Sequence, residues 1–145
     1  MRIKSLNPKE TSYLAAILGS EIIKTRSLVV LGLVGDLGAG KTTFTKSLIK
    51  ALGSKKKVTS PTFLIMRRFV LKNKRNVYHI DAYRVAAYDL VHLGAKEIFK
   101  SPNIVVVEWA DKVKQILPKG TIWINFVHGK NSNHQNERHL TFNRR

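Results

Sequence analysis

The sequence contains no cysteine, few acidic residues and no long apolar run. Without cysteine, the chain can form neither a disulfide nor a thiolate metal site, and a reducing compartment fits this composition. The N-terminal residues lack the apolar segment that is typical of a secretory signal. The longest apolar run, Leu28–Val34, is far shorter than the roughly 20 residues that a membrane helix needs. These absences predict a soluble, cytoplasmic protein with no membrane segment.

Acidic residues number 9 against 26 lysines and arginines, which gives a formal net charge of +17. A field this positive favours phosphate-rich partners such as RNA. A lysine-rich genome would produce the same balance without any such partner. The basic residues are scattered along the chain and accompany no recognisable nucleic-acid-binding module. Charge alone therefore does not distinguish the two explanations.

The 145 residues are enough for one compact domain with a hydrophobic core, and we expect a single domain over residues 1–145. Apolar periodicity predicts helices from Pro8 to about Lys24, over Thr42–Leu52 and over Asp89–Phe99. Strands are expected at Leu28–Val34, Thr62–Val70, Asn76–Asp81, Ile104–Glu108, Thr121–Val127 and His139–Phe142. Helices and strands alternate early and strands dominate late. The pattern predicts an α/β fold with a mixed, partly antiparallel sheet flanked by helices.

One segment, Gly35–Thr42, reads G-D-L-G-A-G-K-T and satisfies G-x-x-x-x-G-K-[ST] without a mismatch. Glycines at these positions let consecutive backbone N–H groups curl around a β-phosphate. The Lys41 ammonium then reaches the β- and γ-phosphate oxygens, and the Thr42 hydroxyl ligates magnesium. A buried strand is expected before this segment and a helix after it. The sequence therefore predicts a P-loop NTPase that binds a nucleoside triphosphate with Mg²⁺ and hydrolyses it.

Two carboxylates follow predicted strands at their carboxyl ends. Asp81 ends one strand and Glu108 ends another. In open α/β sheets this edge is where ligands bind, and a P-loop site needs an acid there for the magnesium shell. We assign Asp81 to that shell, and Glu108 to magnesium or to orienting the attacking water. The candidate catalytic residues are thus Lys41, Asp81 and Glu108, and the candidate metal ligands are Thr42, Asp81 and Glu108.

Other polar and aromatic residues near these motifs carry weaker signals. Hydroxyls in Ser60–Thr62 could sense the γ-phosphate, but the residues alone favour a simple turn. Trp109 could stack on a ligand or partner, or be an ordinary packed indole. His79 alternates within a strand, which favours a core or interface histidine over a catalyst.

The sequence lacks the motifs by which GTPases recognise guanine and respond to the γ-phosphate. Asn73–Asn76 does not match the guanine motif N-K-x-D, and Asp81–Arg84 does not match the GTPase switch motif D-x-x-G. Adenine is therefore the default, and ATP the expected nucleotide.

Four motifs together resemble the bacterial TsaE (YjeE) family. They stand, in matching order and separation, at Gly35–Phe44 (G-D-L-G-A-G-K-T-T-F), Ser60–Phe63 (S-P-T-F), His79–Arg84 (H-I-D-A-Y-R) and Val107–Trp109 (V-E-W). The resemblance implies a small ATPase that is needed to make threonylcarbamoyladenosine, the modified adenosine beside the tRNA anticodon. It also implies docking on the TsaD–TsaB protein pair, with ATP hydrolysis resetting that complex between rounds and little turnover by the ATPase alone.

The same resemblance assigns ligand contacts by motif position. It implies Mg²⁺ on Thr42 with Glu108 at or near the metal, and it places Thr11 at the adenine end of the nucleotide. The triphosphate is expected on Leu37, Gly38, Ala39, Gly40, Lys41, Thr42 and Thr43. Arg67 and Arg68 depart from the family pattern, because an acid often follows the S-P-T strand there.

Two other readings compete with this one. A small-molecule P-loop kinase would need an acceptor pocket and usually an arginine-rich lid, and the chain has no insertion long enough for a lid. A charge-driven nucleic-acid-binding module with a vestigial loop would bind RNA in a salt-dependent manner that ignores nucleotide.

Overall fold

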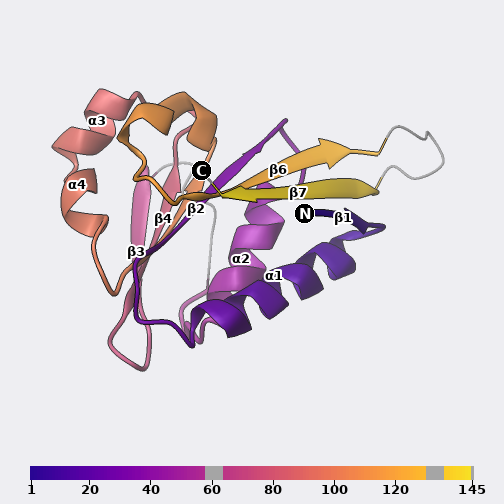
Figure 1. Ribbon diagram of the computed structural model, residues 1–145, viewed down its shortest axis with the longest axis horizontal. Coiled ribbons are helices and arrows are strands. Elements are labelled where there is room, and N and C mark those ends of the chain that lie inside the picture. The colour runs from indigo at the N-terminus through magenta and orange to yellow at the C-terminus, as the bar shows by residue number, and fades with distance from the viewer. Residues whose placement is uncertain (58–63, 130–135, 145) are drawn as a thin grey trace.

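Seven strands form one mixed sheet in the computed structural model, which describes residues 1–57, 64–129 and 136–144 (Figure 1). The strands are β1 (Arg2–Ser5), β2 (Val29–Gly35), β3 (Met66–Val70), β4 (Asn76–Asp81), β5 (Ile104–Glu108), β6 (Ile122–His128) and β7 (Arg138–Arg144). Their order in space is β1-β7-β6-β2-β5-β4-β3. The four central strands β6, β2, β5 and β4 are parallel to one another, whereas β3, β7 and β1 pair antiparallel.

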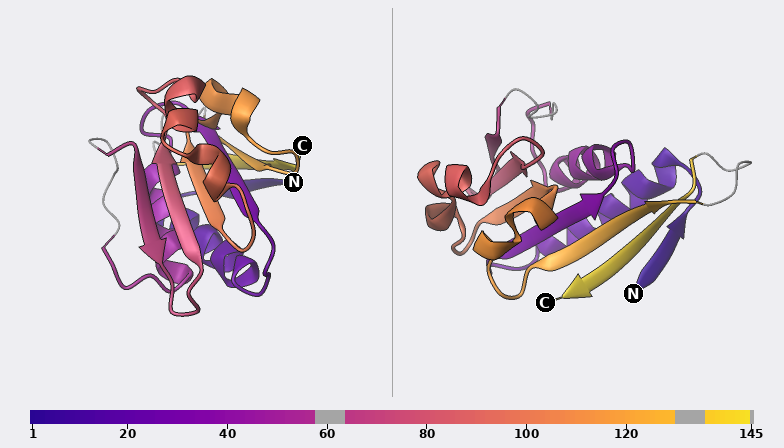
Figure 2. Two further views of the ribbon diagram at one scale, coloured as in Figure 1. Left: turned by 90° about the vertical axis from the view of Figure 1, so that its left-hand side faces the viewer. Right: turned by 90° about the horizontal axis from the view of Figure 1, so that it is seen from above.

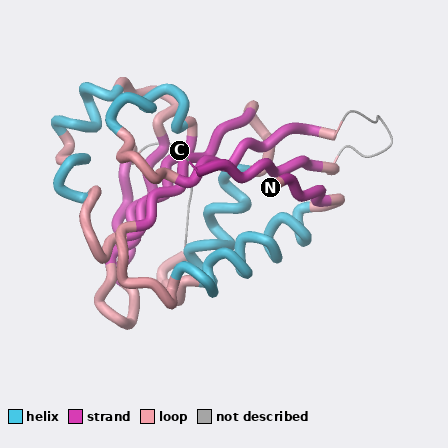
Figure 3. The backbone as a smooth tube through the Cα atoms, viewed as in Figure 1, coloured by secondary structure: helices cyan, strands magenta, loops and turns pink. Residues whose placement is uncertain are grey.

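Helices cover both faces of this sheet. They are α1 (Pro8–Ile22), α2 (Lys41–Ala51), α3 (Ala87–His92), α4 (Ala95–Ile98) and the 3₁₀ helix η1 (Ala110–Ile116). Helices α1 and α2 lie together on one face, and α3, α4 and η1 lie toward the other (Figures 2 and 3). The mixed, partly antiparallel sheet flanked by helices confirms the predicted fold class.

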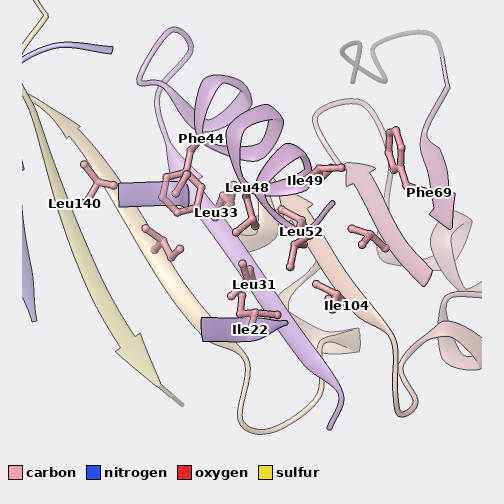
Figure 4. Packing of buried hydrophobic residues seen from close by; sticks show 14 of the residues in the cluster. Ile22, Leu31, Leu33, Phe44, Leu48, Ile49, Leu52, Phe69, Ile104 and Leu140 are labelled. Carbon is pink, nitrogen blue, oxygen red and sulfur yellow. The ribbon is translucent and has the colours of Figure 1, made fainter. Parts of the chain in front are cut away.

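Strand β5 shows how the sequence builds both hydrophobic layers, because successive side chains of a strand point to opposite faces. Ile104 and Val106 pack with α1 and α2, and Figure 4 shows Ile104 in this layer. Val105 and Val107 pack with α3, α4 and η1. All four side chains are fully buried. An unbroken aliphatic run is therefore what this position requires.

Helix α1 is capped at its N-terminus and crosses α2 closely near its C-terminal end. The Asn7 side chain accepts a hydrogen bond from the Glu10 N–H at 3.0 Å, as its position before Pro8 predicts. A Cβ added at Gly19 would lie 3.0 Å from the Ala51 Cβ, so glycine permits the helices to approach this closely. Helix α2 is thereby packed tightly against α1 in its last turn.

Two expected elements were placed wrongly. The helix expected over Asp89–Phe99 is two short helices, because Gly94 adopts a left-handed φ of 85° and starts α4 afresh. The strand expected over Thr62–Val70 begins only at Met66, and Thr62 lies outside the described residues. Strand β1 and helix η1 were not anticipated. None of the helices in the described ranges has the length and apolarity of a transmembrane span.

Arg75 ties together the sheet end that lies opposite the carboxyl ends of the parallel strands. Its side chain is buried and donates to the carbonyl of Pro102 at 2.6 Å and of Thr25 at 2.8 Å. It also donates to the carbonyls of Ile22 and Ser27, both at 3.2 Å. One guanidinium therefore joins the end of α1, the approach to β2 and the approach to β5.

Replacing this guanidinium should destabilise the fold. Arg75→Met would remove the shared donor of four carbonyls, one of them on the buried Ile22, and we expect the free energy of unfolding to fall by about 2–4 kcal/mol. Urea denaturation followed by circular dichroism measures this. Arg68→Met, at an exposed position on β3, is the matched control and should change stability by less than about 0.5 kcal/mol. Equal stability of the two variants would show that Arg75 does not hold these segments together.

Candidate functional site

The parallel strands β2, β5 and β4 end side by side at one edge of the sheet. Asp81 and Glu108 are register partners on β4 and β5, and Glu108 is also the register partner of Leu33, two residues before the end of β2. The loop that follows Gly35 starts at this same edge. Both predicted carboxylates and the predicted phosphate loop are therefore brought together, as the strand ends led us to expect.

The loop itself is shaped by glycines with positive φ. Gly35, Gly38 and Gly40 have φ values of 147°, 74° and 101°. Gly40 is the N-terminal capping residue of α2, and no side chain caps the amides of that helix. A Cβ at Gly38 or Gly40 would meet no atom within 4 Å, so this side of the loop is open. Free amides and the positive end of the helix dipole make an anion-binding position here.

Lys41, the first residue of α2, is almost completely buried within the loop. Its ammonium donates to the carbonyls of Gly35 and Asp36, the latter at 2.8 Å, and lies 3.8 Å from the centre of the Trp109 ring. Burial lowers the pKa of Lys41 below its ordinary value, although the nearby Glu108 and Asp36 carboxylates partly oppose this. The Lys41 side-chain nitrogen thus lies at the centre of the loop, bonded to two of the loop's own carbonyls.

A chain of hydrogen bonds joins α2 to the two strands. The Thr42 hydroxyl donates to one Glu108 oxygen at 2.8 Å, and the His79 Nε2 lies 2.8 Å from the other. Burial opposes ionisation of Glu108, but the contacts from His79 and Thr42 outweigh it and hold its pKa below the ordinary value. Glu108 is therefore a carboxylate at neutral pH, with both of its oxygens oriented.

A hollow of ≈ 980 Å³ lies in front of these groups. It is lined by Leu37, Gly38, Ala39, Gly40, Lys41, Thr42, Thr43, Asp81, Tyr83, Arg84, Glu108 and Trp109. Every predicted triphosphate and metal contact lines this one space. Asp81 is half-buried at its rim and accepts a hydrogen bond from the Tyr83 N–H at 3.0 Å, whereas Glu108 lies beneath Thr42.

Thr11 lines a neighbouring hollow of ≈ 390 Å³ instead. The two hollows share Gly38, Gly40 and Thr43, so Thr11 lies close to the phosphate loop. Its hydroxyl is 2.8 Å from the Ser5 hydroxyl.

Three residues at the site were missed or given less weight from the sequence. His79 was favoured as an ordinary core residue, yet it contacts Glu108. Trp109 adopts a left-handed φ of 58° and packs against Tyr83 as well as Lys41. Arg138, at the start of β7, donates to the Gly38 carbonyl at 3.3 Å and so reaches the loop across a hundred residues. The segment Ser60–Thr62, for which a γ-phosphate sensor and a simple turn were the two alternatives, lies outside the described residues.

The donor set fits a magnesium ion that is shared with phosphates. In the part of the chain that the structure describes, no three His, Cys, Asp or Glu side chains gather as a self-sufficient metal site. Mg²⁺ in phosphate-transfer sites needs only one or two carboxylates, because water and phosphate oxygens complete its shell. One hydroxyl, one buried carboxylate and a second carboxylate at the rim match that requirement.

The chain is similar to a named protein family along most of its length. The model of the family described as "Threonylcarbamoyl adenosine biosynthesis protein TsaE" matches residues 5–139. Proteins named tRNA threonylcarbamoyladenosine biosynthesis protein TsaE are similar in sequence. The one from Treponema pallidum is 35% identical over 126 residues, 86% of this chain and 90% of the relative. The one from Bacillus subtilis is 36% identical over 127 residues, 86% of this chain and 75% of the relative.

The match to the Haemophilus influenzae protein of the same name is 35% identical over 104 residues. It spans 71% of this chain and only 65% of the relative. Among solved structures, that of Bacillus subtilis YdiB superposes with a TM-score of 0.72 at 29% identity, covering 98% of this chain and 83% of the other.

The two ends of the loop should respond differently to an added methyl group. A Cβ at Gly35 would lie 2.4 Å from the Phe126 carbonyl oxygen, whereas one at Gly38 meets nothing. We expect Gly35→Ala to lower the free energy of unfolding by at least about 2 kcal/mol and Gly38→Ala by only about 1 kcal/mol, the cost of the left-handed backbone. Thermal and urea unfolding of both variants tests this. A Gly35→Ala variant as stable as Gly38→Ala would contradict this geometry of the loop.

Proposed function

The chain belongs to the TsaE family, and from this membership we propose that it is a Mg²⁺-dependent ATPase of tRNA threonylcarbamoyladenosine biosynthesis. The observation that carries the proposal is the open phosphate loop with the Thr42–Glu108 hydrogen bond directly behind it. Modification of tRNA is the role that the names of the relatives state, and the cytoplasm is the compartment that fits it.

The loop residues would hold the triphosphate. Uncapped amides at the start of α2 point at the hollow, and only glycine lets the backbone expose them at this curvature. The Lys41 ammonium would exchange its two carbonyl acceptors for phosphate oxygens, which are better partners because they carry charge. Leu37, Ala39 and Thr43 line the same space and complete the contact.

Thr42, Glu108 and Asp81 would hold the metal. When bound, Mg²⁺ would neutralise charge on the phosphate oxygens during transfer to water. Glu108 is suited to the inner position because it is buried, ionised and already oriented by Thr42 and His79. Asp81, at the rim, is suited to the outer shell or to the water. The residues thus support the roles proposed for both acids, with Glu108 closer to the metal.

The hollow beside Thr11 would take the nucleoside end. It opens next to Gly38, Gly40 and Thr43, on the α1 side of the loop. Its lining of hydroxyl, amide and guanidinium groups offers hydrogen bonds to a base or ribose.

Docking on TsaD and TsaB is the partner proposal that follows from the family. Large apolar side chains stand exposed at the mouth of the site: Leu37 is 77% exposed and Tyr83 42%. Residues like these at the lip of a nucleotide site are suited to a partner that covers it. Such a partner would explain an ATPase that turns over slowly alone.

Binding and hydrolysis should separate in two variants. Lys41→Ala removes the central charge and should abolish Mg²⁺-ATP binding in a calorimetric titration. Glu108→Ala should keep ATP bound while phosphate release falls at least about tenfold, or 1.4 kcal/mol of barrier. Lys46→Ala, an exposed position on α2, is the control for both measurements. Normal turnover in Glu108→Ala would remove this residue from the mechanism.

The family role is tested by assembly with the partners. We expect the chain to form a complex with TsaD–TsaB that depends on ATP, measured by size-exclusion chromatography with and without nucleotide. The γ-phosphate of ATP should be released as free inorganic phosphate. Transfer of the γ-phosphate to a metabolite, without such a complex, would replace this proposal by the kinase alternative.

A further inference from the structure

Lysine side chains gather around a hollow of ≈ 700 Å³ at the C-terminal end of α2 and in the loop after it. Its lining, here called the α2 lysine patch, consists of Lys46, Lys50, Ser54, Lys55, Lys56 and Lys57. Every one of these lysines is exposed. The patch therefore presents five ammonium groups to solvent in one concave place.

The positive charge of the patch is not neutralised by the chain. Residues 41–57 contain no aspartate or glutamate, and among the described residues no carboxylate forms an ion pair with a patch lysine. Elsewhere the chain does pair its lysines: Lys24 lies 2.6 Å from Glu21, and Lys4 lies 3.1 Å from Glu137. Like charges held this close repel one another, so binding an anion that spans several of them relieves the repulsion.

The chemistry of the lining selects the kind of anion. The described lining contains no aromatic ring on which a base could stack, which indicates contact with phosphates rather than bases. It also contains no large apolar side chain that could enter a bilayer, unlike membrane-binding surfaces. Lys46 and Lys50 stand one helical turn apart, about 6 Å along the axis, so both can contact one phosphodiester chain.

We propose that the α2 lysine patch binds the phosphodiester backbone of RNA, independently of base sequence. That the polyanion is RNA rests on the proposed function in tRNA modification; that it is a polyanion rests on the patch alone. The loop that would hold nucleotide precedes the N-terminus of α2, about 8 Å along the helix axis from Lys46 and about 16 Å from the end of the helix. RNA binding at the patch therefore needs no ATP.

The test measures binding of the full chain to a fluorescent, unmodified tRNA transcript by anisotropy between 50 and 200 mM KCl. The patch variant carries Lys46→Gln, Lys50→Gln and Lys56→Gln. We expect it to bind at least about tenfold more weakly and to lower the slope of log affinity against log salt by roughly 2, because three phosphate contacts are lost. The control variant carries Lys96→Gln, Lys114→Gln and Lys119→Gln, which removes the same charge from exposed positions elsewhere. It should change the affinity less than about twofold.

Equal weakening by both variants would overturn the proposal in favour of diffuse net charge, and wild-type binding by the patch variant would overturn it outright. So would loss of binding to phosphatidylserine vesicles in the patch variant with tRNA binding unchanged. Calorimetry of the patch variant should show wild-type Mg²⁺-ATP binding. Failure of the wild-type chain to bind ATP would refute the proposed function, whereas the two lysine variants would still decide whether the patch binds RNA.

Discussion

The hydrogen bond between Thr42 and Glu108 is the contact on which the rest of the site depends. It joins the first turn of α2 to the end of β5, and it exists because β2 and β5 are parallel neighbours whose ends reach the same edge. The positions of Lys41 and Asp81 follow from this contact. Lys41 precedes Thr42 and must lie inside the loop, while Asp81 is the register partner of Glu108 and must lie beside it. Three parallel strands thus convert distant sequence motifs into one constellation.

Local patterns predicted the parts of the structure that local chemistry determines. The strand Ile104–Glu108 agrees residue for residue, because an aliphatic run between turn residues suits only a strand buried on both faces. The loop at Gly35–Thr42 could be predicted for a similar reason, since only glycine tolerates its dihedral angles. Strand β1 was not predicted because four alternating residues are too few to indicate a strand. It depends on pairing with β7 at the other end of the chain. Helix η1 was not predicted because it follows a left-handed turn at Trp109. A bulky residue adopts that conformation only under tertiary constraint.

The contact between His79 and Glu108 could have been predicted from the sequence if the order of the strands had been considered. It stands two positions before Asp81 on β4, so both side chains project to the same face. Val77 on that same face packs in the core beneath α1 and α2. A histidine there must lie under α2, within reach of an acid on the neighbouring strand. Alternation taken together with strand order therefore predicts the contact with Glu108, whereas alternation alone suggests only a buried side chain.

The two ends of helix α2 lie in regions of different charge, with acidic residues near its N-terminus and lysines at its C-terminus. Its N-terminus faces the acids at the strand ends: Asp36, Asp81 and Glu108 all lie close enough to raise the pKa of Lys41 against the effect of burial. Its C-terminus carries lysines without acids. A chain with 9 acids and a charge of +17 thus places four of them, Asp111 included, near a single buried ammonium. Two of these carboxylates, Glu108 and Asp81, are the proposed metal ligands, and their negative charge distinguishes this hollow from a purely basic one that would accept any polyanion. The two binding modes proposed for this chain, a metal-bound triphosphate at one end of α2 and an RNA backbone at the other, both agree with this distribution of charge.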